Sequence, residues 1–246
     1  MIKNNLKLIV FLTVFGLVGG FFTALYTIES LDQALIDEAL AQIGSIEMLI
    51  VITTIQSLIY AVLLGLIGKI IAEKIGLWHK ISFELKPLIY TAIASVIGGM
   101  IFILADVLVF AKFIPAVMDS YALKPTISYI ISSITYGGVV EEVMLRLFFM
   151  SLIAFVISKL SKDKTLTDTH IIIANILSVL LFAAGHIPAT VQTIGISPII
   201  IFRCFLLNGG FGLIFGRMYR KYGIQYAMLT HAGVHIISKL IWIMFI

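Results

Sequence analysis

Charged residues are scarce in this sequence, and cysteine is almost absent. Only 12% of the 246 residues are charged, against about 25% in ordinary proteins. Too few polar side chains therefore exist to cover a water-soluble domain of this size, and a disordered chain, a collagen or a coiled coil is excluded as well. A single cysteine, Cys204, excludes an intramolecular disulfide. The net charge of +4 is small and scattered, so it gives no indication of nucleic-acid binding.

Apolar residues are what the sequence has in abundance: 61% are hydrophobic, and the mean hydropathy is +1.12. Because about 20 apolar residues cross the hydrocarbon core of a bilayer as a helix, we predict an all-α, polytopic membrane helix bundle that forms one domain over residues 1–246. The first run is too long for a signal peptide and is kept as a membrane helix. The expected spans, about seven in number, are Leu6–Ile28, Met48–Ile71, Pro87–Ala111, Ile127–Leu160, Ile171–Ile194, Pro198–Met218 and Ile224–Ile246.

Three of these helices precede residue 127, and residues 127–246 hold the polar motifs described below. The fourth run is too long for one simple crossing, and Gly137-Gly138 can kink it. An eighth short or re-entrant segment therefore stays open. Residues 31–42 have the spacing of an amphipathic helix outside the membrane.

Basic residues collect on one side of the predicted bundle. Residues 29–47 hold five acids and no base, and the same side carries only two bases, Lys112 and Lys124. Under the positive-inside rule, this distribution predicts a multi-pass protein of the cell (plasma) membrane with a cytoplasmic amino terminus. The twelve bases of the predicted inner side are Lys3, Lys7, Lys69, Lys74, Lys80, Lys86, Lys159, Lys162, Lys164, Arg217, Arg220 and Lys221.

Some polar residues inside the spans have structural explanations. Asp106 and Arg203 are expected near the outer interface, where they reach water or lipid headgroups. Lys239 is expected to extend its ammonium toward an interface, and Cys204 to be a small core residue.

A first cluster that resists such explanations is Glu141-Glu142-Val143-Met144-Leu145-Arg146. On a helix, Glu142 and Arg146 share a face and can form a buried ion pair. Glu141 lies about 100° away without that partner, and a buried carboxyl of this kind makes a general acid or base. The alternative is that both acids balance Arg146 and lock the helix packing.

Three histidines also lie inside spans. His186 shares a helix face with Phe182, and an isolated histidine there is more often a packed, hydrogen-bonded residue than a catalyst. His231 and His235 are four residues apart, which suits metal ligation or two donors aimed at one oxygen. Their alternative is a pair of core histidines. Residue counting puts Glu141 and His231 at a similar depth, about 10 Å from the cytosolic face, and His186 deeper.

The order Glu-Glu-x-x-x-Arg, Phe-x-x-x-His and His-x-x-x-(Asn/Asp) on successive membrane helices resembles the CPBP family over residues 127–246. This family comprises type II CAAX prenyl endopeptidases and bacteriocin-processing or immunity proteins, also called Abi proteins. The resemblance implies that Glu141 and His186 activate a water, while His231 and position 235 hold the scissile carbonyl oxygen. Glu142, Arg146 and Phe182 are then supporting residues.

Position 235 departs from the family pattern, since it is histidine rather than asparagine or aspartate. A neutral imidazole still donates one hydrogen bond. The change also completes a set of three histidines and one carboxylate that can hold zinc: Glu141, His186, His231 and His235.

The sequence thus predicts an intramembrane endopeptidase that cuts a membrane-associated peptide or protein within the lipid bilayer. The first alternative is a non-enzymatic bacteriocin-immunity or membrane scaffold protein of the same family. The second is a proton- or ion-coupled transporter, although the inverted repeats typical of that class are not found in the sequence.

Overall fold

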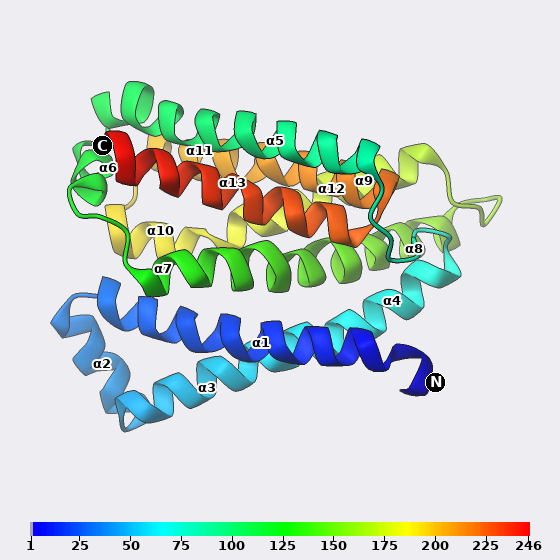
Figure 1. The fold of residues 1–246 in the computed structure, drawn as a ribbon, viewed down its shortest axis with the longest axis horizontal. Coiled ribbons are helices and arrows are strands. Elements are labelled where there is room, and N and C mark those ends of the chain that lie inside the picture. The colour runs from blue at the N-terminus through cyan, green and yellow to red at the C-terminus, as the bar shows by residue number, and fades with distance from the viewer. Residues whose placement is uncertain (1) are drawn as a thin grey trace.

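The computed structural model describes residues 2–246, with side chains from residue 5 onward. Over these residues the fold is all-α and contains no strand, as predicted (Figure 1). Lys3, one of the expected inner-side bases, lies outside the described side chains. The amino and carboxyl ends lie at opposite ends of the bundle (Figure 1), as an odd number of crossings requires.

Seven helices among the described residues are long and apolar enough to span a membrane, which confirms the predicted multi-pass bundle. The first and last residues of these helices lie within a few residues of the expected ones. The spans are Asn5–Ser30, Ile46–Lys74, Leu85–Lys112, Ile127–Leu160, Asp168–Ile194, Pro198–Tyr222 and Ile224–Phe245.

Most spans are built from several helical pieces, because π-helical turns interrupt the α-helix. The amino-terminal pieces are α1 (Ile2–Ser30), α2 (Gln33–Ile43), α3 (Ile46–Ile59), η1 (Tyr60–Leu64), α4 (Gly65–Lys74), α5 (Leu85–Leu104), η2 (Ala105–Val109), η3 (Phe110–Lys112) and α6 (Pro115–Tyr121). The later pieces are α7 (Ile127–Ser132), η4 (Ser133–Glu141), η5 (Val143–Met150), α8 (Ser151–Leu160), α9 (Asp168–Gly185), α10 (Ile187–Ile194), α11 (Pro198–Cys204), η6 (Phe205–Gly209), α12 (Gly210–Tyr222) and α13 (Ile224–Phe245).

The fourth span is the centre of the bundle. Its η4 segment packs against α1 and α13, and its η5 segment packs against α4, α9 and α12. In Figure 1 it runs between a layer formed by α1, α3 and α4 and the layer that holds α5 and α13. Gly137-Gly138 does not break the helix; the backbone widens into the π-helix of η4 instead. The one continuous span leaves no eighth crossing among the described helices.

Local sequence signals set the ends of the helices that carry the motifs. Thr167 caps α9 by accepting from the backbone N–H of His170, and the His170 side chain accepts from the Thr167 N–H in return. The turn from α12 into α13 has Gly223 at a φ of 108°, a conformation that glycine adopts without a Cβ penalty. The predicted external helix is present as α2, and none of its residues is buried.

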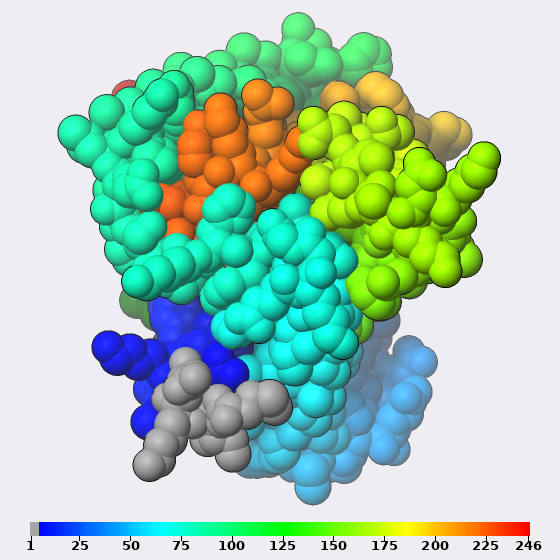
Figure 2. Space-filling view, turned by 90° about the vertical axis from the view of Figure 1, so that its right-hand side faces the viewer, coloured from blue at the N-terminus to red at the C-terminus, as the bar shows by residue number. Residues whose placement is uncertain are grey.

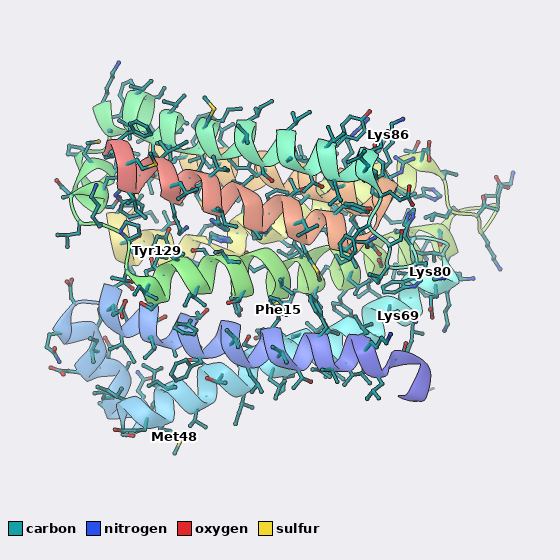
Figure 3. All side chains as sticks on the ribbon, viewed as in Figure 1. Phe15, Met48, Lys69, Lys80, Lys86 and Tyr129 are labelled. Atoms are coloured by element: carbon teal, nitrogen blue, oxygen red, sulfur yellow. The ribbon has the colours of Figure 1, made fainter. Side chains whose placement is uncertain are left out.

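The two ends of the bundle differ in charge as predicted. Lys69, Lys80 and Lys86 lie at the end away from Met48 and Tyr129 (Figure 3). Figure 2 looks onto that basic end, where the turn between α12 and α13 is flanked by the segments before α5 and before α9.

Candidate active site

The Glu141 carboxylate and the His186 imidazole face each other across the bundle. Glu141 is the last residue of η4, and His186 lies between α9 and α10. Their closest atoms, Glu141 Oε1 and His186 Nε2, are 4.0 Å apart. The side chains retain 18% and 32% exposure respectively, so neither is sealed inside the bundle. Residue counting had put His186 deeper than Glu141, but the 4.0 Å separation shows that the two side chains meet.

The end of α9 also fixes which His186 nitrogen faces Glu141. The last carbonyl groups of a helix lack intrahelical partners, and the Phe182 carbonyl accepts from His186 Nδ1 at 2.9 Å. A carbonyl only accepts, so Nδ1 carries a proton. In the neutral ring, Nε2 is then the acceptor, and this is the nitrogen turned toward Glu141.

Glu142 has different partners, as its position on the helix predicted. Its Oε2 lies 3.4 Å from Arg146 Nε, and both side chains are fully buried. Its Oε1 lies 2.9 Å from Nδ1 of His231 on α13. Arg146 Nη2 also donates to the Gly212 carbonyl on α12 at 2.9 Å. The expected ion pair is therefore present, and in addition it ties the central helix to α12 and α13.

Aromatic rings enclose this ion pair. The Arg146 guanidinium lies 5.1 Å from the ring centroid of Phe182 and 5.7 Å from that of Phe215, within the range of cation–π attraction. Phe215 stacks on the His231 ring at 4.4 Å. Phe182 thus has the supporting place predicted for it, whereas Phe215 was missed, because an apolar residue on a glycine-rich helix has no distinguishing sequence pattern.

His235 completes the group next to Gly137. The His231 and His235 rings stack with centroids 4.9 Å apart. A Cβ added at Gly137 would lie 3.1 Å from His235 Nε2 and 3.9 Å from Glu141 Oε2. The missing side chain of Gly137 therefore leaves a small space that both groups border. The structure brings all four predicted residues, Glu141, His186, His231 and His235, into one neighbourhood.

Zinc binding by these four residues stays an untested prediction. Among the described residues, no group of three or more histidine, cysteine, aspartate or glutamate side chains is close enough to hold a metal ion. His231 Nδ1 is occupied by Glu142, and His186 Nδ1 by the Phe182 carbonyl. Zinc-ligating histidines make bonds of this kind through their second ring nitrogen, but the four side chains are not gathered closely enough to hold an ion, so no step below uses one.

Two expectations for single charged residues are corrected. Lys239 does not extend to an interface: it is only 4% exposed and points into the bundle beside His235. Asp106 does not reach water or headgroups either, because it is fully buried and binds Arg203 through both carboxylate oxygens at 2.6 and 2.5 Å. Cys204 is buried, as expected of a small core residue.

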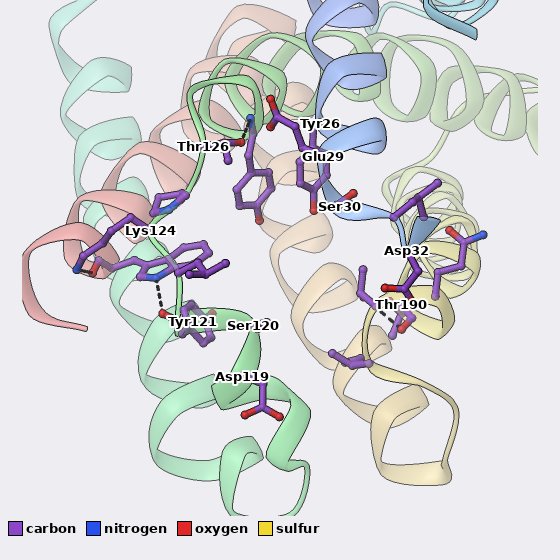
Figure 4. A pocket seen from close by; sticks show the side chains of 18 of the residues that line it. Tyr26, Glu29, Ser30, Asp32, Asp119, Ser120, Tyr121, Lys124, Thr126 and Thr190 are labelled. Carbon is purple, nitrogen blue, oxygen red and sulfur yellow. Dashed lines mark hydrogen bonds between the residues drawn. The ribbon is translucent and has the colours of Figure 1, made fainter. Parts of the chain in front are cut away.

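A separate pocket of about 520 Å³ opens at the acidic end of the bundle (Figure 4). Glu29, Asp32 and Lys124 line it, and Tyr121 and Arg203 connect it to the buried Asp106. Burial and the neighbouring Asp106 carboxylate raise the pKa of Tyr121, so its hydroxyl remains a donor to that carboxylate. None of the four site residues is among its lining, so this pocket is distinct from the candidate active site.

Comparison with known proteins finds a family match over the stretch that carries the motifs. Residues 122–237 match the family model for type II CAAX prenyl endopeptidase, Rce1-like, and this stretch contains all four site residues. The match confirms the resemblance to the CPBP family over nearly the same residues. No curated protein and no solved structure matches the chain.

Proposed function

Because residues 122–237 match the Rce1-like family model, we propose that this protein is an intramembrane endopeptidase that hydrolyses a peptide bond with a water activated by Glu141 and His186. The observation that carries the proposal is the 4.0 Å separation of Glu141 Oε1 and His186 Nε2 inside a membrane-spanning bundle. A carboxylate and an imidazole nitrogen are both acceptors, and a water molecule has two protons to donate.

The geometry suits one water between these two acceptors. At hydrogen-bond distances of about 2.8 Å, a water that donates to both atoms subtends an angle of about 90° at its oxygen, close to the angle between its own O–H bonds. One proton then points at Glu141 and the other at His186. The remaining lone pairs of the oxygen are free to attack a carbonyl carbon.

The reaction follows as ordinary general base and general acid catalysis. Glu141 takes a proton as the water oxygen bonds to the carbonyl carbon, and the π electrons move to the carbonyl oxygen. When the C–N bond breaks, Glu141 returns that proton to the leaving nitrogen. The products are a carboxyl group and an amine, and Glu141 is again a carboxylate.

His231 and His235 are the donors that we assign to the developing oxyanion. His235 borders the same gap at Gly137 as Glu141 does, and the His231 ring stacks on His235. With Nδ1 held by Glu142, Nε2 is the His231 nitrogen that is free for the substrate, and it donates when the ring carries both protons. Removing one such donor typically lowers kcat by about 100- to 1,000-fold.

The substrate that we propose is a membrane-associated peptide or protein, because the site lies within the span of the bundle. We place the protein in the cell membrane with its amino terminus in the cytoplasm. The support for this orientation is the gathering of bases at one end of the bundle and of acids at the other.

The test is cleavage of a library of membrane-tethered peptides by the purified protein in liposomes. Glu141→Gln and His186→Ala should each abolish or strongly reduce cleavage, because one removes the base and the other removes the second acceptor for the water. Glu38→Gln, on the exposed face of α2, is the matched control and should cleave as the wild type does. Equal cleavage by the wild type and Glu141→Gln would overturn the proposal.

The same variant separates this function from a binding-only role in bacteriocin immunity. In cells challenged with a bacteriocin, a non-enzymatic immunity protein retains protection when Glu141 is replaced by Gln, since shape and hydrogen bonding are nearly unchanged. A protease loses it.

A further inference from the structure

Lys239 is a buried base that the proposed reaction leaves unused. It lies on α13 and is only 4% exposed. No described carboxylate lies within ion-pairing distance of its ammonium, in contrast to the paired Arg146 and Arg203. An ionisable side chain inside a membrane bundle is costly, and such residues are usually functional.

Lys239 lies between His235 of the candidate active site and Tyr129, which lines the pocket at the acidic end. Its Nζ is 3.5 Å from His235 Nδ1, one helical turn earlier on α13. It also lies 4.2 Å from the ring centroid of Tyr129, which provides a cation–π contact in place of a counter-ion. The Tyr129 ring therefore holds the ammonium against the imidazole.

This contact decides where His235 carries its proton. When Lys239 is an ammonium, it has three donors and no acceptor, so His235 Nδ1 accepts. A neutral imidazole with an accepting Nδ1 has its single proton on Nε2. That nitrogen is the one that lies over Gly137, beside the Glu141 carboxylate.

We propose that Lys239 is a positioning residue that holds His235 in the Nε2–H form, so that His235 supplies a hydrogen-bond donor to the scissile carbonyl oxygen. The inference rests on the proposed endopeptidase function and extends it to a residue beyond the family match, which ends at residue 237. An amide side chain at position 235 carries its donor permanently, but a free imidazole exchanges between two forms. The form with a bare Nε2 would present a lone pair to the oxyanion and repel it.

The first test is kinetic and uses position 235 as its own control. Lys239→Met keeps the length and apolar stem of the side chain but removes the donor, and it should lower kcat by about 10- to 100-fold with little change in KM. In a His235→Asn background, the same Lys239→Met change should alter kcat less than about twofold, since the amide donor needs no partner. Lys112→Met, at an exposed site, is the control for loss of a lysine. Equal losses in both backgrounds would show that Lys239 has only a structural role and overturn the proposal.

The second test does not depend on cleavage. Nitrogen-15 NMR of histidine-labelled protein, assigned with His235→Asn, reports which ring nitrogen of His235 is protonated. The wild type should show protonation at Nε2 alone, and Lys239→Met should show a mixture of both forms. A wild-type His235 protonated at Nδ1 would refute the role of Lys239. A wild type that cuts no peptide but shows the expected Nε2–H form would refute the endopeptidase function and leave the role of Lys239 supported.

Discussion

The buried pair of Glu142 and Arg146 predicts a large coupling in stability. Both side chains have no exposed surface, and their closest atoms are 3.4 Å apart. Arg146→Met leaves the Glu142 carboxylate buried with only His231 as a partner, and Glu142→Gln leaves the guanidinium without its counter-ion. Removing one partner of a buried pair costs about 3–5 kcal/mol, because the remaining charge is uncompensated.

The contacts of the pair indicate that each single variant loses stability near the lower end of that range. Arg146 Nε and Nη1 and Glu142 Oε2 have no geometrically good hydrogen bond, so the pair is not ideally arranged. We expect about 3 kcal/mol of destabilisation for each single variant. The double variant buries no charge and should be destabilised by no more than either single one. The coupling energy is then about 3 kcal/mol.

The measurement is a double-mutant cycle of unfolding free energies in mixed micelles, followed by far-UV circular dichroism. The chain offers a matched control in Lys69 and Glu73, an ion pair with the same i, i+4 spacing that is partly exposed. The cycle of Lys69→Met and Glu73→Gln should give about 0.3–0.5 kcal/mol. The reasoning fails if the stability losses of the Glu142 and Arg146 variants simply add, or if Arg146→Met costs less than about 1 kcal/mol. Either result would show that removing one charge does not leave the other uncompensated.

Three further outcomes are expected. Gly137→Ala adds a methyl group 3.1 Å from His235 Nε2, so it should reduce cleavage at least tenfold and leave the stability unchanged. The control is Gly138→Ala, whose methyl group meets the backbone of α13 at 2.9 Å. It should destabilise the fold by about 1–3 kcal/mol in the same unfolding assay. Asp106→Asn leaves Arg203 without its buried counter-ion and should lower the free energy of unfolding by about 3 kcal/mol. Its specific activity should not change, because this pair is distinct from the candidate active site. A drop in specific activity would contradict that separation. Chelation with EDTA should leave cleavage intact because the described residues form no metal-ligand group; a loss that added zinc restores would assign a metal to the reaction.

Much of the fold could be predicted because hydropathy alone controls where a chain crosses a bilayer. The seven expected spans agree with the helices to within a few residues, and α2 was expected from its spacing. The break at His186 was missed, although Pro188 was a signal: proline is favoured in the first turn of a new helix, and α10 begins at Ile187.

The candidate site could be predicted as a set of residues but not as a set of contacts. The motifs pointed to Glu141 and the three histidines, while the bond from Glu142 to His231 joins residues 89 positions apart, a pairing that no local pattern contains. Lys239 was misjudged for a different reason. The general rule that long basic side chains reach an interface was applied to it, and its place one helical turn after His235 on the same face was not considered.

The π-helical backbone of η4 sets the angular register of the catalytic helix. A π-helical turn closes i to i+5 hydrogen bonds and so holds one residue more than an α-helical turn. If the same residues relaxed to a regular α-helix, the extra residue would add about 100° of rotation, and everything beyond it would turn by that angle relative to its neighbours. Glu141 would then face away from His186. The π-helical form of this segment is consequently a constraint as strict as the identity of the residues that it carries.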